Sequence, residues 1–78
     1  MTDIPVILSQ PGCRPCAGVK TWFKNNGVDF VERDVTEDED ALNLLTSLGY
    51  AGTPVIIAGD THWQGVQPDK MASLKPTN

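Results

Sequence analysis

Two cysteines, Cys13 and Cys16, are the residues of this sequence whose type and spacing could carry chemistry. They are the only cysteines in the chain, and they follow an apolar segment at residues 4–8 and precede a helical pattern at residues 17–26. A Cys-x-x-Cys at a strand-to-helix junction, in a chain without secretory features, is typical of a redox site. The sequence therefore predicts a pair that cycles between dithiol and disulfide.

The position of each cysteine predicts different roles for the two sulfurs. If the helix starts near Arg14, Cys13 lies at its N-terminal edge, where free backbone N–H groups and the helix dipole favour negative charge. The pKa of a free cysteine is roughly 8.5, and such a setting, with a cation nearby, lowers it to about 3.5–7.5. We expect Cys13 to be the attacking thiolate and the more shielded Cys16 to be the resolving thiol. Pro15 suits the first helical turn, where its missing N–H costs little.

Two other interpretations of the cysteines stay open at this point. They could form half of a zinc site shared between two chains, because a tetrahedral site needs four ligands and the only histidine, His62, is distant in sequence. They could also be unreactive core residues, since free cysteine is commonly buried.

Composition limits the class of protein. A length of 78 residues suits one domain, which we expect to span residues 1–78. Six Lys and Arg against ten Asp and Glu give a net charge of −4, which argues against nucleic acid as a partner. The chain has neither an apolar run of some 18 residues nor a signal-peptide pattern, so we expect a cytoplasmic protein without a membrane span.

The hydrophobic pattern predicts the first half of the fold. Residues 4–8 form a short apolar run that indicates a central strand covered on both faces. Val19, Trp22 and Phe23 follow helical spacing within residues 17–26, and Gly27 should end that helix in a left-handed conformation. Residues 28–35 alternate in polarity and indicate a second strand.

The second half begins with a predicted capping box, with Thr36 as N-cap and Glu39 three residues later. The expected apolar face of that helix, which Gly49 should end, consists of Ala41, Leu42, Leu44, Leu45 and Leu48. Residues 55–58 and 61–64 indicate a hairpin around Gly59-Asp60. Pro68 should open a last helix, with Met71 and Leu74 facing inward and Pro76 ending it.

The order of these elements is strand, helix, strand, helix, strand, strand, helix. Alternation of strands and helices implies parallel pairing with right-handed crossovers, and the final hairpin adds an antiparallel edge. We therefore expect an α/β fold in which a mixed four-stranded sheet is flanked by three helices.

This arrangement resembles the thioredoxin superfamily and, at this length, glutaredoxin-like proteins, over almost the whole chain. Three motifs carry the resemblance: Ser9-Gln10-Pro11-Gly12-Cys13-Arg14-Pro15-Cys16, Gly52-Thr53-Pro54-Val55, and His62-Trp63-Gln64-Gly65-Val66-Gln67-Pro68-Asp69-Lys70. The last motif, with Leu48-Gly49-Tyr50, is most similar to the NrdH-type redoxins, which reduce class Ib ribonucleotide reductase.

The resemblance implies further site residues. Pro54 should be cis and lie beside the cysteines, exposing the backbone of Thr53 to pair with an extended segment of a substrate. Arg14, Pro15 and Trp63 are then expected to contribute to the partner-binding surface, with Trp63 covering the active-site edge. No metal ligand or bound cofactor is expected.

The resemblance also implies an electron source and partners. The chain lacks the lysine, the aromatic residue and the late polar pair typical of glutathione-using glutaredoxins; their places hold Gln10, Arg14-Pro15 and Val66-Gln67. This favours NADPH and thioredoxin reductase as the electron source, with ribonucleotide reductase or another disulfide-containing protein as the target of a monomeric redoxin. A glutathione-dependent glutaredoxin is the alternative, and the late motif also departs from the NrdH-type Trp-Ser-Gly-Phe-Arg-Pro.

Overall fold

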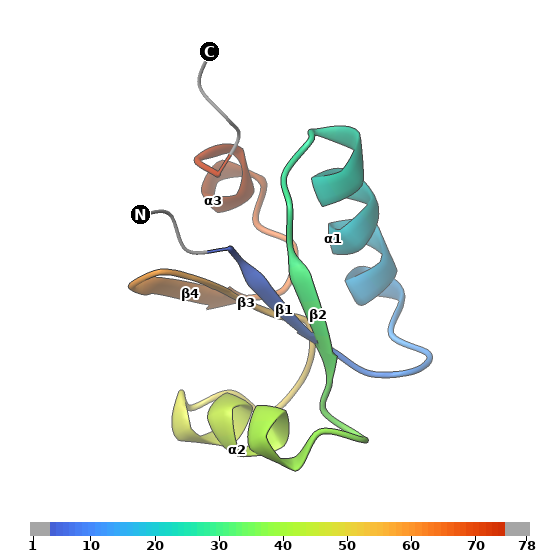
Figure 1. The fold of residues 1–78 in the computed structure, drawn as a ribbon, viewed down its shortest axis with the longest axis vertical. Helices are drawn as coiled ribbons and strands as arrows, with labels where there is room; N and C mark the ends of the chain where they lie inside the picture. Colours follow the sequence, from blue (N-terminus) through green and yellow to red (C-terminus); the bar gives the residue numbers. More distant parts are fainter. Residues whose placement is uncertain (1–3, 75–78) are drawn as a thin grey trace.

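The computed structural model describes residues 4–74, which form a four-stranded sheet with helices on both faces (Figure 1). The elements in chain order are β1 (Val6–Ser9), α1 (Arg14–Asn25), β2 (Val31–Asp34), α2 (Glu39–Ser47), β3 (Val55–Ala58), β4 (Thr61–Gln64) and α3 (Pro68–Ala72). The expected α/β class, element order and number of strands and helices are confirmed. The predicted end of the last helix at Pro76 lies outside the described residues.

The strands are ordered β2-β1-β3-β4, so β1 is central and pairs on both sides. It runs parallel to β2, with Val6 opposite Val31, and antiparallel to β3, with Leu8 opposite Val55. β3 and β4 form the expected antiparallel hairpin. The sheet is mixed, as predicted, with β1 between its parallel and antiparallel parts.

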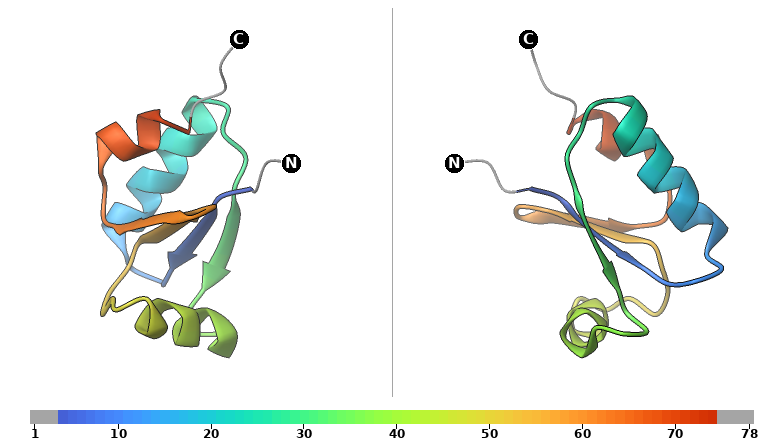
Figure 2. Two further views of the ribbon diagram at one scale, coloured as in Figure 1. Left: turned by 90° about the vertical axis from the view of Figure 1, so that its left-hand side faces the viewer. Right: turned by 45° about the vertical axis from the view of Figure 1, so that its right-hand side comes forward.

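Alternating side chains of the sheet contact two separate groups of core residues, because successive residues of a strand face opposite sides. Ile7 and Ile56 pack with Phe23 of α1 and Met71 of α3 on one face. Leu8 and Val55 pack against α2 on the other face. Two further views show α1 and α3 on the same side of the sheet and α2 on the opposite side (Figure 2). Strand β1 is therefore covered on both faces, as its apolar run predicted.

Strand β2 is shorter than the predicted strand at residues 28–35. Its first residue is Val31, and the preceding segment packs against the end of α1: the Val28 amide donates to the Phe23 carbonyl at 2.9 Å, and the Phe23 and Phe30 rings meet edge to face. The alternation of Val28 and Phe30 thus reflects contacts with a helix. Val31, which begins the strand, is exposed.

Helix α2 starts later than predicted, and the proposed capping box is wrong. Asp38 is the N-cap, with its side chain accepting a hydrogen bond from the Ala41 amide at 3.1 Å. Thr36 instead hydrogen-bonds to Asp34, through both its amide and its hydroxyl, in the turn before the helix. The competing carboxylate of Asp34 draws Thr36 away from the capping position.

The predicted apolar face of α2 is partly wrong. Ala41 and Leu45 are buried, and Leu44 and Leu48 are half-buried, whereas Leu42 is 43 % exposed. A nine-residue helix that lies on one face of the sheet can bury only one side of its surface.

The alternation of strands and helices had suggested that β3 is parallel to β1, but the two strands are antiparallel. The path of the chain through α2 explains the difference. β2 ends with Asp34 opposite Ser9, and β3 begins with Val55 opposite Leu8, so the chain leaves and re-enters the sheet at the same end. In Figure 1, α2 lies below the sheet and crosses the direction of β2 instead of running back along that strand. The next strand must therefore run in the opposite direction.

Among the described residues, no helix is long and apolar enough to span a membrane.

Candidate active site

The loop after β1 places the two cysteines at the start of α1. Ser9 ends β1, and a turn at Pro11-Gly12 brings the chain round to the helix, with Gly12 at a φ of +77°. Most residues with a Cβ are strained in that conformation, so glycine is favoured here. Cys13 is the N-cap and Arg14 begins the helix, where the sequence had placed its start.

The two cysteines are joined by a disulfide, and their surroundings differ. Their Cα atoms are 5.3 Å apart. Cys16 faces the core and is 2 % exposed, whereas Cys13 is half-buried. A soluble thiol or an incoming disulfide can therefore reach the Cys13 sulfur more readily than the Cys16 sulfur.

The N-terminus of α1 points a hydrogen-bond donor at Cys13. The Cys16 amide donates to the Cys13 Sγ at 3.2 Å, so this sulfur takes the place that an N-cap oxygen usually has. Free N–H groups and the helix dipole favour negative charge at this position. In the reduced protein the same geometry favours a thiolate on Cys13. Pro15 fits the first turn of the helix, as expected.

A groove of about 510 Å³ opens beside the disulfide, between the loop, α1 and β2. It is lined by Ser9, Gln10, Pro11, Gly12, Cys13, Arg14, Cys16, Ala17, Lys20, Glu32 and Asp34. Of the predicted site residues, both cysteines and Arg14 line this groove, and Pro15, Thr53, Pro54 and Trp63 do not. Its charged side chains come from α1 and β2 and carry both signs.

The predicted cis proline is present. The Thr53–Pro54 peptide bond is cis, and Pro54 is buried directly before β3. Because Val55 pairs with Leu8, Pro54 lies at the end of the sheet from which the cysteine loop leaves. The Pro54 carbonyl accepts a hydrogen bond from the Gly65 amide at 2.8 Å, which ties the loop after β4 to this position.

Trp63 was expected to cover the edge of the active site at the surface, but it is buried. It is 3 % exposed and packs in the core cluster between the sheet, α1 and α3. Its side chain therefore offers no area to a partner in this structure, and we leave it out of the proposed partner surface. Arg14 and Pro15, by contrast, are exposed next to Cys13.

No group of three or more His, Cys, Asp or Glu side chains within residues 4–74 is arranged to bind a metal ion. The groove beside the cysteines instead contains a hydrogen-bonded set of Ser9, Lys20 and Glu32. Sequence reasoning missed Glu32. The only signal for it was the parallel pairing of the first two strands, which places a residue of β2 beside the end of β1.

A disulfide at a helix N-terminus, a cis proline before the neighbouring strand and this sheet topology together define a thiol-disulfide oxidoreductase with a thioredoxin-like fold. Residues 6–63 match the glutaredoxin family model. The glutaredoxin-like protein NrdH of Escherichia coli (strain K12) is 34% identical over 70 residues, covering 90% of this chain and 86% of the relative. NrdH of Salmonella typhimurium is 32% identical over 71 residues, covering 91% and 88%.

Comparison with solved structures leads to the same group of proteins as comparison of sequences. The solved structure of the glutaredoxin-like protein NrdH-redoxin from Escherichia coli matches with a TM-score of 0.88 and 32% identity, over 95% of this chain and 97% of that one. That protein is described as having a thioredoxin-like activity profile. The chain belongs to the glutaredoxin family, among its NrdH-type glutaredoxin-like proteins.

Proposed function

We propose that this protein is a dithiol electron donor that reduces disulfides in other proteins through Cys13 and Cys16. The observation that carries the proposal is the asymmetry of the pair: Cys13 is the more accessible and its sulfur meets the N-terminus of α1, whereas Cys16 is buried one turn further on. An attacking thiol needs access and thiolate character, and a resolving thiol needs closeness to the first sulfur.

In the proposed reaction, the Cys13 thiolate attacks one sulfur of the target disulfide. The target S–S bond breaks, its second sulfur leaves as a thiolate and takes up a proton, and a mixed disulfide forms. Cys16 then loses its proton and attacks the Cys13 sulfur, which releases the remaining target thiolate. Two electrons have passed to the target, and the Cys13–Cys16 disulfide that the structure shows is the product.

The cis Thr53–Pro54 turn supplies the second part of the proposed partner site. Thr53 is half-buried at the end of the sheet that carries the cysteine loop, where its backbone can pair with an extended segment of the target. Arg14 and Pro15 are exposed beside Cys13 and would touch the same segment. This places recognition mainly on the backbone, which suits a donor whose targets share a disulfide but not a sequence.

For re-reduction we propose thioredoxin reductase with NADPH, so the chain itself binds no cofactor. Gln10, Arg14-Pro15 and Val66-Gln67 replace the usual glutathione anchors, and an NrdH relative is described as thioredoxin-like in its activity. We further propose a monomer of one domain, residues 1–78, that works in the cytoplasm on ribonucleotide reductase or another disulfide-containing protein. The net charge of −4 gives no support for a nucleic-acid partner.

A coupled assay tests this function. NADPH consumption is followed with a protein disulfide as substrate, driven either by thioredoxin reductase or by glutathione with glutathione reductase. We expect turnover with thioredoxin reductase alone. Turnover only with glutathione would identify a glutathione-dependent glutaredoxin instead.

The same preparation, purified under reducing conditions, is analysed for metal and mass. We expect a monomer without zinc. About one zinc ion per two chains, with no turnover in either arm, would identify a zinc-bridged dimer and contradict the redox function.

A further inference from the structure

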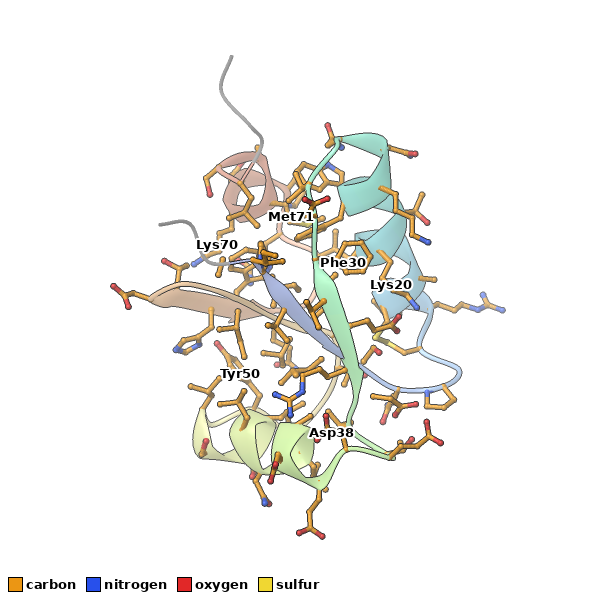
Figure 3. The ribbon with its side chains drawn as sticks, in the orientation of Figure 1. Lys20, Phe30, Asp38, Tyr50, Lys70 and Met71 are labelled. Atoms are coloured by element: carbon orange, nitrogen blue, oxygen red, sulfur yellow. A yellow bond between two sulfur atoms is a disulfide. The ribbon has the colours of Figure 1, made fainter. Side chains whose placement is uncertain are left out.

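Side chains from β1 and α1 donate to the same carboxylate oxygen of Glu32, on β2, in the groove that holds the cysteines. The Ser9 hydroxyl of β1 donates to Glu32 Oε2 at 2.7 Å, and the Lys20 ammonium of α1 donates to the same oxygen at 2.8 Å. Ser9 is only 3 % exposed, and Lys20 extends from α1 toward β2 (Figure 3). The Glu32 carboxylate is therefore bound by one donor from each of two neighbouring elements.

This hydrogen-bonded set lines the same groove as Cys13 and Cys16. Lys20 follows Cys16 by four residues, so the two side chains leave α1 on the same face, one turn apart. The charged groups that face the groove are Arg14 and Lys20 from α1 and Glu32 and Asp34 from β2; the loop at residues 10–12 adds none. Lys20 and Glu32 are thus one pair of opposite charges within a set of two positive and two negative groups.

Glu32 is suited to act as a constant charge and unsuited to relay a proton. The hydrogen bond from Lys20, and then the one from Ser9, hold the pKa of Glu32 below its usual value. The group stays ionised at neutral pH and is a weak proton acceptor. A carboxylate that takes the proton of a leaving or attacking thiol would need its pKa raised toward neutrality instead.

We propose that Glu32 is a positioning residue of the redox site: its carboxylate holds the Lys20 ammonium and cancels its charge beside the cysteines, which makes the reduced dithiol a stronger reductant. The inference rests on the proposed function only in taking Cys13 and Cys16 as the redox pair. It assigns to this chain a control of redox strength that lies outside the Cys-x-x-Cys motif.

The direction follows from electrostatics. A positive charge near a thiol favours its thiolate, and a negative charge disfavours it. A stabilised thiolate stabilises the reduced form and so makes the couple more oxidising. Removing the Glu32 charge unmasks Lys20 and should favour the reduced protein, whereas removing the Lys20 charge leaves Glu32 alone and should favour the disulfide.

The test measures the equilibrium between this protein and dithiothreitol, in its dithiol and disulfide forms, at pH 7, from the fractions of reduced and oxidised protein. Glu32→Gln should shift the equilibrium toward the reduced protein by about two- to fivefold, the effect of one partly screened charge. Lys20→Met should shift it by a similar factor toward the disulfide. The double variant should lie between the two, and the Glu32→Gln shift should shrink at high salt.

The matched control is Glu39→Gln, which removes a carboxylate from α2 outside the groove and should leave the equilibrium unchanged. Shifts of the same sign in Glu32→Gln and Lys20→Met, or no shift in either, would overturn the proposal and leave the set a purely structural contact. A small-molecule dithiol needs no protein partner, so these outcomes are independent of the coupled assay. Glu32 and Lys20 are both partly exposed, and circular dichroism verifies that each variant is folded.

Discussion

At the scale of single residues, the site depends on where two identical side chains fall relative to the end of a helix. Cys13 lies outside the first turn and accepts a hydrogen bond from it, whereas Cys16 lies within that turn and faces the core. A separation of three residues is enough to place one sulfur near solvent at the helix N-terminus and to bury the other in the core. The same motif in the middle of a strand would lack the helix N-terminus and would point the two sulfurs to opposite faces of the sheet.

A second N-cap, Asp38, allows a quantitative prediction. Asp38→Ala removes the acceptor for the Ala41 amide and the partner of Arg33, so the midpoint of thermal unfolding should fall by about 4–8 °C. Thr36→Ala is the matched control, because Thr36 lies in the turn and caps nothing; its effect should be clearly smaller. Equal losses in the two variants would contradict the observed cap.

The effect of Asp38 should depend on pH in a known direction. The hydrogen bond from Arg33, and then that from the Ala41 amide, lower the pKa of Asp38 below 3.8. A carboxylate with a lowered folded-state pKa stabilises the fold fully above its unfolded value and loses this contribution as the pH falls through the folded value. The difference between parent and Asp38→Ala should therefore be constant near neutral pH and disappear in acid.

Residue types and local spacing were enough to predict part of the site. Cys13, Cys16 and Pro15 follow from the motif and the start of the helix, and the resemblance supplied the cis bond at Pro54. Glu32 could not be found in this way. Its contacts with Ser9 and Lys20 span 23 and 12 residues, and they exist only because β1 and β2 pair in one particular register.

At the scale of the elements, the sequence predicted which segments form helices and strands better than it predicted where they begin. Gly27 and Gly49 ended α1 and α2 as expected, both at positive φ. The predicted start of α2 was wrong because Thr36 hydrogen-bonds to Asp34 in the preceding turn instead of capping the helix. The direction of β3 was also missed, since it depends on how α2 lies against the sheet.

The orientation of α2 predicts a large difference between two leucines three residues apart. Leu45 is 3 % exposed in the cluster with Leu8 and Val55, so Leu45→Ala should lower the free energy of unfolding by about 2–5 kcal/mol. Leu42 is 43 % exposed, and Leu42→Ala should change it by no more than about 0.5 kcal/mol. Urea unfolding of both variants measures the difference. A loss at Leu42 as large as that at Leu45 would mean that α2 is rotated from the position described.

At the scale of the whole molecule, the topology gathers the functional parts at one end of the sheet. The cysteine loop leaves β1 there, β2 ends there with Asp34, and β3 begins there after Pro54. The Gly65 amide then ties the loop after β4 to the Pro54 carbonyl. Segments that are far apart in sequence thus lie at the same end of the sheet as the disulfide, and the rest of the small fold supports them.

The central claim is that Cys13 attacks and Cys16 resolves, and a trapping experiment tests it most directly. Reduced Cys16→Ser protein is mixed with an oxidised protein substrate, and covalent complexes are separated without reductant and mapped by mass spectrometry. We predict a stable mixed disulfide through Cys13 that dithiothreitol releases, and no complex with Cys13→Ser. Normal turnover by Cys16→Ser, or a complex formed through Cys16 in the Cys13→Ser protein, would contradict the assignment.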